Sequence, residues 1–250
     1  MNKLSVVIIA LNEEENIGRC LESVRGVADE IVVVDSGSKD KTVSIAESRN
    51  ARVIHRVFTN YIEQKNFAAQ QASGDFILNL DADEALSDEL RSSIQYEKQS
   101  SFPAGAYSMN RLNFYCGKAI RTCGWYPDKK IRIWKKGKGK WVGKLVHEKM
   151  KPEEGIAVKN LQGDILHYTV PTRELFIQQT ENFASLAAEQ MKSENTLFLF
   201  LKMVFSPPAK FVSSYFLNLG ITEGADGFTI CFYQSREVFR KYFLAIKLKL

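Results

Sequence analysis

Four short apolar runs in the first third of the chain constrain the fold most. Each run is followed by polar residues and then by a helix-like segment, and the runs are almost continuously apolar, as is typical of parallel strands buried on both faces. Strands that alternate with helices in this way predict right-handed crossovers and an open twisted, mostly parallel sheet with flanking helices, an α/β fold. The runs are Leu4–Ala10, Ile31–Val34, Arg52–His55 and Phe76–Leu80.

The pattern changes after about residue 100. Ala106–Tyr115 and Lys129–Trp134 alternate like strands, and Ile165–Tyr168 is a further strand candidate. A helix is expected after Pro171, followed by more helical sequence. We therefore expect one α/β domain over residues 1–170 and a C-terminal helical extension over residues 171–250.

Two apolar segments lie in this extension, with a proline pair between them. Leu197–Phe205 and Phe211–Leu219 are rich in large apolar residues, and Pro207-Pro208 is expected to break the helix that joins them. Neither segment reaches the ~20 uninterrupted apolar residues of a spanning helix. Two interpretations stay open: the tail forms a surface for an anionic membrane, or it packs on the α/β domain.

Positive charge is concentrated in the second half of the chain. The formal net charge is +5, and Lys129–Lys151 alone holds ten basic residues against one acidic residue, Glu148. This excess favours anionic partners, either a phosphorylated glycan or an anionic membrane face. Because no nucleic-acid recognition motif is present, we expect no nucleic-acid partner.

The N-terminus and the cysteines predict a reducing compartment. The first strand begins at Leu4, which leaves no room for a signal peptide ahead of it. The four cysteines form no Cys-x-x-Cys pair, so reduced thiols in the core are expected in place of disulfides or a metal site. We expect a cytoplasmic protein, either free or peripheral on the inner face of the cytoplasmic membrane.

Acidic residues follow the buried strands. Asp81-Ala82-Asp83 comes directly after the fourth strand, where two carboxylates can share a hard divalent cation such as Mg or Mn. Such a cation can bridge a diphosphate and neutralise the charge that develops as it leaves. Asp35 closes the second strand, and ligands of open parallel sheets bind beyond the carboxyl ends of the strands. Asn12, after the first strand, is also expected to cap a helix, in a capping box with Glu15.

Three of these segments together resemble the successive signatures of family 2 glycosyltransferases. They are Ala10–Glu13, Asp35–Thr42 and Asp81–Glu84, and their order and placement at strand ends also match. The resemblance covers roughly Asn2–Tyr168 and implies the GT-A fold. It also implies a nucleotide-sugar binding half over residues 1–100 and an acceptor and base half over residues 101–170.

Further segments in the second half resemble one branch of that family, the lipopolysaccharide core β-glucosyltransferases. They are Gly124–Asp128, Arg132–Trp134 and Trp141–Glu148. The resemblance implies an inverting, metal-dependent enzyme that transfers a hexose from a nucleotide-diphosphate sugar, with UDP-glucose the leading donor. The implied acceptor is a lipopolysaccharide core or a related envelope glycan or glycolipid.

The resemblance also assigns roles to individual residues. Asp83 and His167 would hold the metal. Arg132 can bind a phosphate of donor or acceptor, and Trp125 and Trp141 are candidate sugar platforms for the acceptor. The remaining donor-binding candidates are Ala10, Leu11, Asn12, Glu13, Asp35, Ser36, Gly37, Asp81 and Ala82.

Glu148 stands where these enzymes carry the catalytic base. Many relatives have Glu-Asp there, whereas this chain has His147-Glu148. The ordinary pKa of histidine is closer to neutral pH, so His147 stays an alternative base. We expect a direct displacement with inversion, because no carboxylate can be nominated as the nucleophile of a retaining mechanism.

Two other classes of function compete with the transferase. A phosphohydrolase of the haloacid dehalogenase type also uses Asp-x-Asp after a strand, but it wants Thr or Val where this chain has Ala85. A non-catalytic protein that binds glycans or a membrane surface would not require Asp81, Asp83, Glu148 and His167 together. Hydrolysis of the donor with and without EDTA distinguishes these classes.

Overall fold

The computed structural model describes residues 2–144 and 147–249, which divide into two compact units. Unit 1 contains the chain up to Leu112 together with Asp128–Tyr168, and unit 2 contains Asn113–Pro127 together with Thr169–Leu250. These units are defined by packing alone, so the domain limits of 1–170 and 171–250 remain a prediction.

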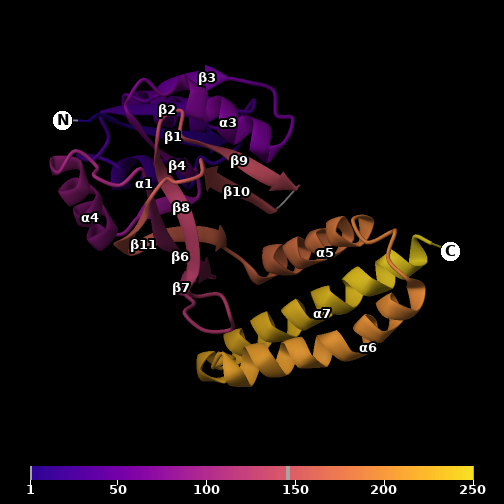
Figure 1. The fold of residues 1–250 in the computed structure, drawn as a ribbon. Coiled ribbons are helices and arrows are strands. Elements are labelled where there is room, and N and C mark those ends of the chain that lie inside the picture. The colour runs from indigo at the N-terminus through magenta and orange to yellow at the C-terminus, as the bar shows by residue number, and fades with distance from the viewer. Residues whose placement is uncertain (1, 145–146, 250) are drawn as a thin grey trace. The chain divides into compact units, whose positions relative to one another are not determined.

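Nine strands of the described residues form one sheet, and Figure 1 labels most of these strands. They are β1 (Leu4–Ala10), β2 (Glu30–Asp35), β3 (Arg52–His55), β4 (Phe76–Asp81), β5 (Glu84–Leu86), β6 (Ala106–Tyr115), β7 (Lys118–Ala119), β8 (Asp128–Lys135) and β11 (Val158–Val170). Their order is β3-β2-β1-β4-β8-β6-β11-β5, and β7 pairs with β6. β1 to β4 are parallel, as predicted, whereas β8 runs antiparallel to both β4 and β6. A separate hairpin joins β9 (Gly139–Lys144) to β10 (His147–Pro152).

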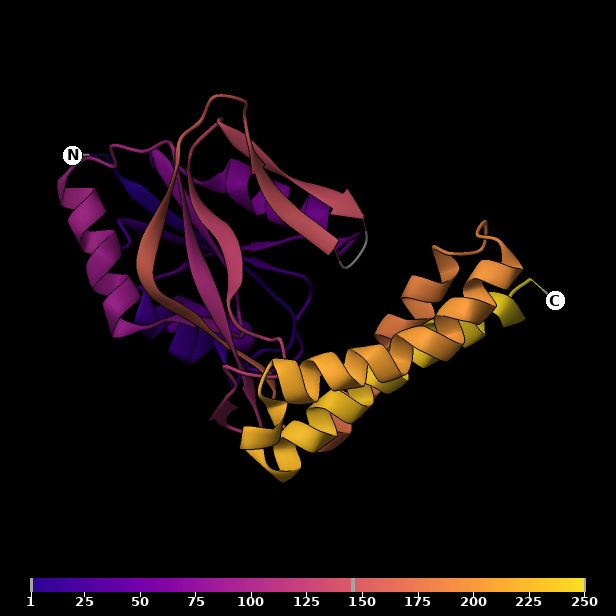
Figure 2. The ribbon, with the colours of Figure 1, turned by 60° about the horizontal axis from the view of Figure 1, so that its bottom comes forward.

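Helices flank the sheet of unit 1 and build most of unit 2. Unit 1 has α1 (Ile17–Ser23), α2 (Thr42–Ser48), α3 (Tyr61–Gln71) and α4 (Asp88–Gln99). Unit 2 has α5 (Arg173–Glu189), α6 (Thr196–Val212), the π-helical turn η1 (Ser213–Leu217), the 3₁₀ turn η2 (Gly220–Glu223) and α7 (Ala225–Lys247). The long helices of unit 2 pack side by side (Figures 1 and 2). In the described part of the chain, no helix combines the length and the apolarity that crossing a membrane requires.

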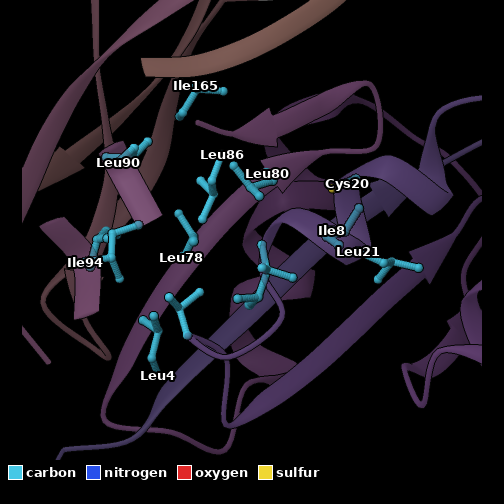
Figure 3. Packing of buried hydrophobic residues seen from close by; sticks show 14 of the residues in the cluster. Leu4, Ile8, Cys20, Leu21, Leu78, Leu80, Leu86, Leu90, Ile94 and Ile165 are labelled. Carbon is cyan, nitrogen blue, oxygen red and sulfur yellow. The ribbon is translucent and has the colours of Figure 1, made fainter. Parts of the chain in front are cut away.

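Two apolar cores cover the two faces of the parallel strands. Every residue of β1 is buried, because successive side chains point to opposite faces and both faces are covered. Ile8 packs with α1 and α4 in one core, and Figure 3 shows it beside Cys20 and Leu21. Val7 packs with α3 and the β9–β10 hairpin in the other core. The predicted α/β architecture is confirmed.

The helix-capping role predicted for Asn12 is wrong. α1 begins at Ile17, and Asn12 adopts a left-handed conformation with φ 53°. Its side-chain oxygen instead accepts a hydrogen bond from the Lys39 amide at 2.9 Å, and its own amide donates to the Ser38 hydroxyl at 2.9 Å. The side chain therefore joins two loops, which leaves it unable to cap the helix.

The helix break predicted at Pro207-Pro208 is also wrong, since α6 continues through both prolines to Val212. Proline removes an amide donor, but its φ is compatible with a helix. The neighbouring α7 supports the backbone here, because the Ser235 hydroxyl donates to the Pro207 carbonyl at 2.7 Å. Packing in unit 2 thus outweighs the local preference.

All four cysteines, each within the described residues, are free thiols, as predicted. Three of them are buried: Cys20, Cys123 and Cys231. Cys116 is exposed, so the prediction of a core position is wrong for this residue. It follows β6 in a turn with φ 49°, where its side chain cannot reach the core.

β11 is positioned by a close backbone contact between its middle and the start of α4. At Gly163, φ is +90°, and a Cβ there would lie 2.3 Å from the Leu90 amide nitrogen. Next to it, the Ser87 amide donates to the Asp164 carbonyl and the Asp164 amide donates to the Ser87 hydroxyl, both at 3.0 Å. β11 then pairs with β5 in a register that places His167 opposite Glu84.

Glu30 gives unit 1 a pH-dependent stability. Burial opposes its ionisation, but hydrogen bonds from Ser5, Ser73 and Arg52 lower the pKa of Glu30 from 4.5 to about 2. A folded pKa below the unfolded one stabilises the protein above pH 4.5, and this contribution is lost as the pH falls toward 2. The Glu30 side chain is 21% exposed, so screening reduces its effect to about 1–2 kcal/mol.

We therefore expect Glu30→Gln to lower the free energy of unfolding by about 1–2 kcal/mol at pH 7 and by much less near pH 3. Denaturant titrations at both pH values measure the difference. Glu47→Gln, at an exposed position of α2, is the matched control and should change little at either pH. An equal loss for Glu30→Gln at both pH values would show that packing, not charge, explains the effect.

Candidate active site

Three parallel strands bring the acidic residues to one edge of the sheet. β1 lies between β2 and β4, and the register pairs Ala10 with Asp35 and Ile9 with Asp81. The carboxyl ends of these strands therefore meet, as expected for a ligand site in an open parallel sheet. Ala10 and Ala82 are buried beside them, whereas Leu11 is 47% exposed.

Asp35 organises the loop after β2. Its buried carboxylate accepts hydrogen bonds from the Gly37 amide at 2.9 Å and from the amide and hydroxyl of Ser38. His55 Nδ1 lies 3.1 Å from the same carboxylate. Burial opposes ionisation, but the bonds from Ser38, Gly37 and His55 lower the pKa of Asp35. The loop is thereby held open, with Gly37 exposed and Ser36 accepting a hydrogen bond from Gln64.

Glu13 connects the loop after β1 to the same region. Its amide donates to the Thr42 hydroxyl at 2.7 Å, and its carboxylate accepts from Asn16 at 2.9 Å. Burial raises the pKa of Glu13, and the nearby carboxylates of Asp83, Asp40 and Asp81 raise it further. The edge of the sheet is thus strongly negative, which suits a cation that accompanies a phosphate.

Asp83 and His167 meet at the end of the fourth strand. His167 Nε2 lies 3.2 Å from Asp83 Oδ2, and the Tyr168 amide donates to the Asp83 carbonyl at 2.9 Å. Both side chains keep partial access to solvent, at 13% for His167 and 23% for Asp83. The structure therefore brings the two predicted metal ligands together.

This pair fits two neighbouring positions of a metal site. Ligands on adjacent corners of an octahedral Mg or Mn site, at about 2.1 Å from the ion, lie about 3 Å apart. Within the described residues, no group of three or more His, Cys, Asp and Glu side chains could hold a metal ion. Asp83 and His167 would therefore need ligand oxygens and water to complete the coordination, as is usual for Mg with phosphates.

Asp81 faces two buried cations instead. Arg132 Nη2 lies 3.3 Å from its Oδ2 and 2.6 Å from Glu84 Oε1. Lys65 Nζ lies 3.0 Å from Asp81 Oδ1. Burial opposes the ionisation of Asp81, but Lys65 and Arg132 hold the pKa of this carboxyl well below its usual range. Asp81 thus positions cations at the site, while Asp83 is the carboxylate that faces His167.

Lys65 joins Asp81 to Glu148. Its Nζ lies 3.1 Å from Glu148 Oε1 and 4.6 Å from the centre of the Trp141 ring, and the residue is only 3% exposed. Trp141 is buried, and the Arg132 guanidinium also lies near its ring, 5.4 Å from the ring centre. Among the described residues, no hydrogen-bond partner meets the Trp141 indole N–H.

Two other residues that were predicted for the site do not belong to this cluster of described side chains. The side chain of His147 and both Leu145 and Val146 are not among the described parts of the structure. Trp125 belongs to unit 2, where its ring packs edge-on against Tyr115 and Phe176. Its predicted role toward the acceptor remains a prediction.

Lys65 and Glu84 were not predicted from the sequence as site residues. Glu84 is buried, and it accepts a hydrogen bond from the Asp81 amide at 3.0 Å as well as binding Arg132. A fully buried lysine or glutamate is rare unless it is paired, so burial would have identified both. The charged partners of Lys65 and Glu84 lie far from them in the sequence. The sequence near each residue therefore gave no signal of a site role, apart from the position of Glu84 directly after Asp83.

A charged site of this kind, at the carboxyl edge of a doubly covered sheet, suits a ligand that carries phosphate. The chain belongs to glycosyl transferase family 2, whose family model matches residues 5–150. The transferase prediction is confirmed at this level, and the phosphohydrolase and non-catalytic alternatives are not supported.

Several known proteins are similar to this chain. The lipopolysaccharide core biosynthesis glycosyltransferase LpsC of Rhizobium meliloti is 29% identical over 96% of this chain and 93% of its own length. An uncharacterized glycosyltransferase of Rickettsia typhi is also 29% identical, over 91% of this chain and 81% of its own. Among solved structures, Mycobacterium tuberculosis glucosyl-3-phosphoglycerate synthase aligns with a TM-score of 0.45 at 22% identity, covering 74% of this chain and 78% of that one. Residues 1–349 of S. aureus TarS align with a TM-score of 0.46 at 16% identity, covering 97% and 90%.

Proposed function

We propose that this chain transfers a hexose, with inversion, from a nucleotide-diphosphate sugar to a lipopolysaccharide core or related envelope glycan. The observation that carries this proposal is the similarity to LpsC along nearly the whole of both chains. UDP-glucose is the proposed donor. A glycolipid acceptor would be held at the inner face of the cytoplasmic membrane, which is the proposed location.

The donor end of the site is assigned to the loops after β1, β2 and β4. Asp35 shapes the loop that would receive the nucleoside, with Leu11, Asn12 and Glu13 beside it. A divalent cation, Mg or Mn, held by Asp83 and His167, would supply charge stabilisation for the departing diphosphate. Arg132 and Lys65 hold fixed positive charge beside Asp81, and they need no reorganisation during the reaction.

Glu148 is the proposed base. Its carboxylate accepts the proton of the acceptor hydroxyl as that oxygen forms a bond to the anomeric carbon. The bond between this carbon and the diphosphate oxygen breaks on the opposite side, and the electron pair leaves with the nucleoside diphosphate. Lys65 fixes the position of Glu148 relative to Asp81, which is what a single displacement requires of its base. The predicted acceptor platform Trp141 is 4% exposed and packs in the apolar core beside Lys65, so its ring has almost no face open to a sugar.

Asp83→Ala tests the metal assignment. Saturating UDP and Mn should raise the melting temperature of the unaltered protein by roughly 5–10 °C, because a ligand at about a hundred times its Kd adds about 2.7 kcal/mol. Asp83→Ala should abolish the metal-dependent part of this shift. Asp88→Ala is the matched control, since Asp88 is 93% exposed in the first turn of α4. An undiminished shift in Asp83→Ala would contradict the assignment.

The same measurement with UDP-, GDP- and dTDP-glucose tests the donor proposal, and UDP-glucose should give the largest shift. Release of UDP from UDP-glucose should stop in EDTA. Release that continues unchanged in EDTA would exclude a divalent cation from the reaction.

A further inference from the structure

Helix α7 exposes several of its large apolar side chains. The residues that it buries are Gly227, Thr229, Ile230, Cys231, Tyr242 and Ala245, and four of these six are small. Four phenylalanines are 43–50% exposed: Phe228, Phe232, Phe239 and Phe243. A helix that faces water only would show the opposite arrangement, with its large apolar residues inside.

Large apolar side chains are also exposed along α6 and η1. Six large apolar side chains there are 47–77% exposed: Leu197, Phe200, Leu201, Phe205, Phe216 and Leu217. Ring contacts connect η1 with α7, because the ring centre of Tyr215 lies 5.1 Å from that of Phe216 and 6.0 Å from that of Phe228. We call the exposed apolar residues of α6, η1 and α7 the outer apolar surface. Soluble monomers rarely expose a continuous apolar patch of this kind, so a partner is expected to cover it.

The charges along α6, η1 and α7 are mostly positive. From Asn195 to Thr222 the only charged residues are Lys202 and Lys210, and no acidic residue occurs. Three acidic residues follow: Glu223 and Asp226, which lie 2.7 and 4.0 Å from Lys118, and the partly buried Glu237 on α7. The lysine Nζ of Lys202 lies 5.5 Å from the centre of the Phe198 ring, so a cation and an aromatic side chain are adjacent on the surface.

We propose that the outer apolar surface binds the anionic interfacial region of a lipid bilayer. Lysines among exposed Phe and Leu residues match acidic headgroups above an acyl layer. A second copy of this chain is a poorer match, because a symmetric contact along α6 and η1 would bring Lys202 and Lys210 together, and this stretch holds no acidic residue to pair them. α6 has 17 residues and is about 25 Å long, which is too short to span and suits a helix that lies in the plane of the interface.

Vesicle binding of the full chain tests this surface. We expect co-sedimentation with phosphatidylcholine vesicles that contain phosphatidylglycerol, and much weaker binding to pure phosphatidylcholine. Phe205→Ser combined with Leu217→Ser should weaken binding roughly 10- to 100-fold, because two side chains lose their apolar burial. Lys202→Gln combined with Lys210→Gln should weaken binding about tenfold on anionic vesicles only.

Tyr96→Ser is the matched control, because Tyr96 is 65% exposed on α4 in unit 1. It should bind vesicles as the unaltered protein does. Circular dichroism and thermal melts of each variant confirm that the fold is retained, which is expected because Phe205 and Leu217 are 66% and 77% exposed. Vesicle binding needs neither donor nor metal, so its result is independent of the proposed transferase reaction.

Two outcomes would overturn the proposal. In the first, the chain does not bind anionic vesicles, and light scattering finds either a monomer or an oligomer that Phe205→Ser with Leu217→Ser dissociates. The oligomer would assign the outer apolar surface to protein contact. In the second, binding to neutral and anionic vesicles is equal and the lysine variant binds unchanged, which would exclude recognition of acidic headgroups.

Discussion

Replacing Glu148 with glutamine is expected to lower the rate of transfer by about 10²- to 10⁴-fold while donor binding is retained, since this range is typical of a lost general base. Glutamine keeps the shape of the side chain but cannot accept the acceptor proton. Lys65 retains Asp81 as a partner at 3.0 Å, so the donor end of the site should stay in place. Steady-state transfer rates measure the loss of transfer, and the UDP-dependent thermal shift measures the retained donor binding.

Glu153→Gln is the matched control, because Glu153 is an exposed glutamate that follows the β9–β10 hairpin and pairs with Lys138 at 3.0 Å. It should transfer at the normal rate. His147→Gln completes the set, since His147 is the alternative base. If Glu148→Gln transferred normally and His147→Gln did not, the base would be His147.

Arg132→Met is expected to lower the free energy of unfolding by about 3–5 kcal/mol, because it leaves the buried Glu84 carboxylate with only the more distant Arg111, at 3.7 Å, as a cation. Glu84 is 1% exposed, and its Oε1 lies 2.6 Å from Arg132 Nη2. Burial alone would lower the pKa of Arg132, but Glu84 and Asp81 raise it, so the guanidinium stays charged. For a chain of this size the loss corresponds to a fall of roughly 6–20 °C in melting temperature. Calorimetry or a denaturant titration measures it.

The double variant Arg132→Met with Glu84→Gln should recover a large part of this loss, because no uncompensated charge is then buried. Arg91→Met serves as the control for removing an arginine from an ion pair. Arg91 and Asp88 form an exposed pair, so its loss should cost at most about 1 kcal/mol. If Arg132→Met were no more destabilising than Arg91→Met, the buried network would contribute nothing to stability.

The sequence predicts the parallel half of the sheet well because its signals are local. Leu4–Ala10 and Arg52–His55 were predicted as strands with the bounds that the structure shows. A run of apolar residues with no polar alternation has few alternatives when both faces are covered. The polar residues that follow such runs come to one edge of the sheet, so the meeting of Asp35 and Asp81 could be foreseen.

The charge network of the site could not be foreseen in the same way. Lys65 lies on α3, its carboxylate partners come from β4 and β10, and nothing near Lys65 in the sequence identifies them. Asn12 and Pro207 show the complementary error. A local preference predicted a cap and a break, and contacts with Lys39 and Ser235 outweighed each of them.

The glycine at position 163 has a consequence for the diphosphate end of the site. β11 reaches His167 only after passing the first turn of α4 with no room for a methyl group. The close packing of these two backbone segments therefore helps to fix the position of His167 relative to Asp83. A residue without a side chain thus helps to set the separation of the two side chains to which the cation is assigned, and the geometry of the site depends on close backbone packing as well as on its ionisable groups.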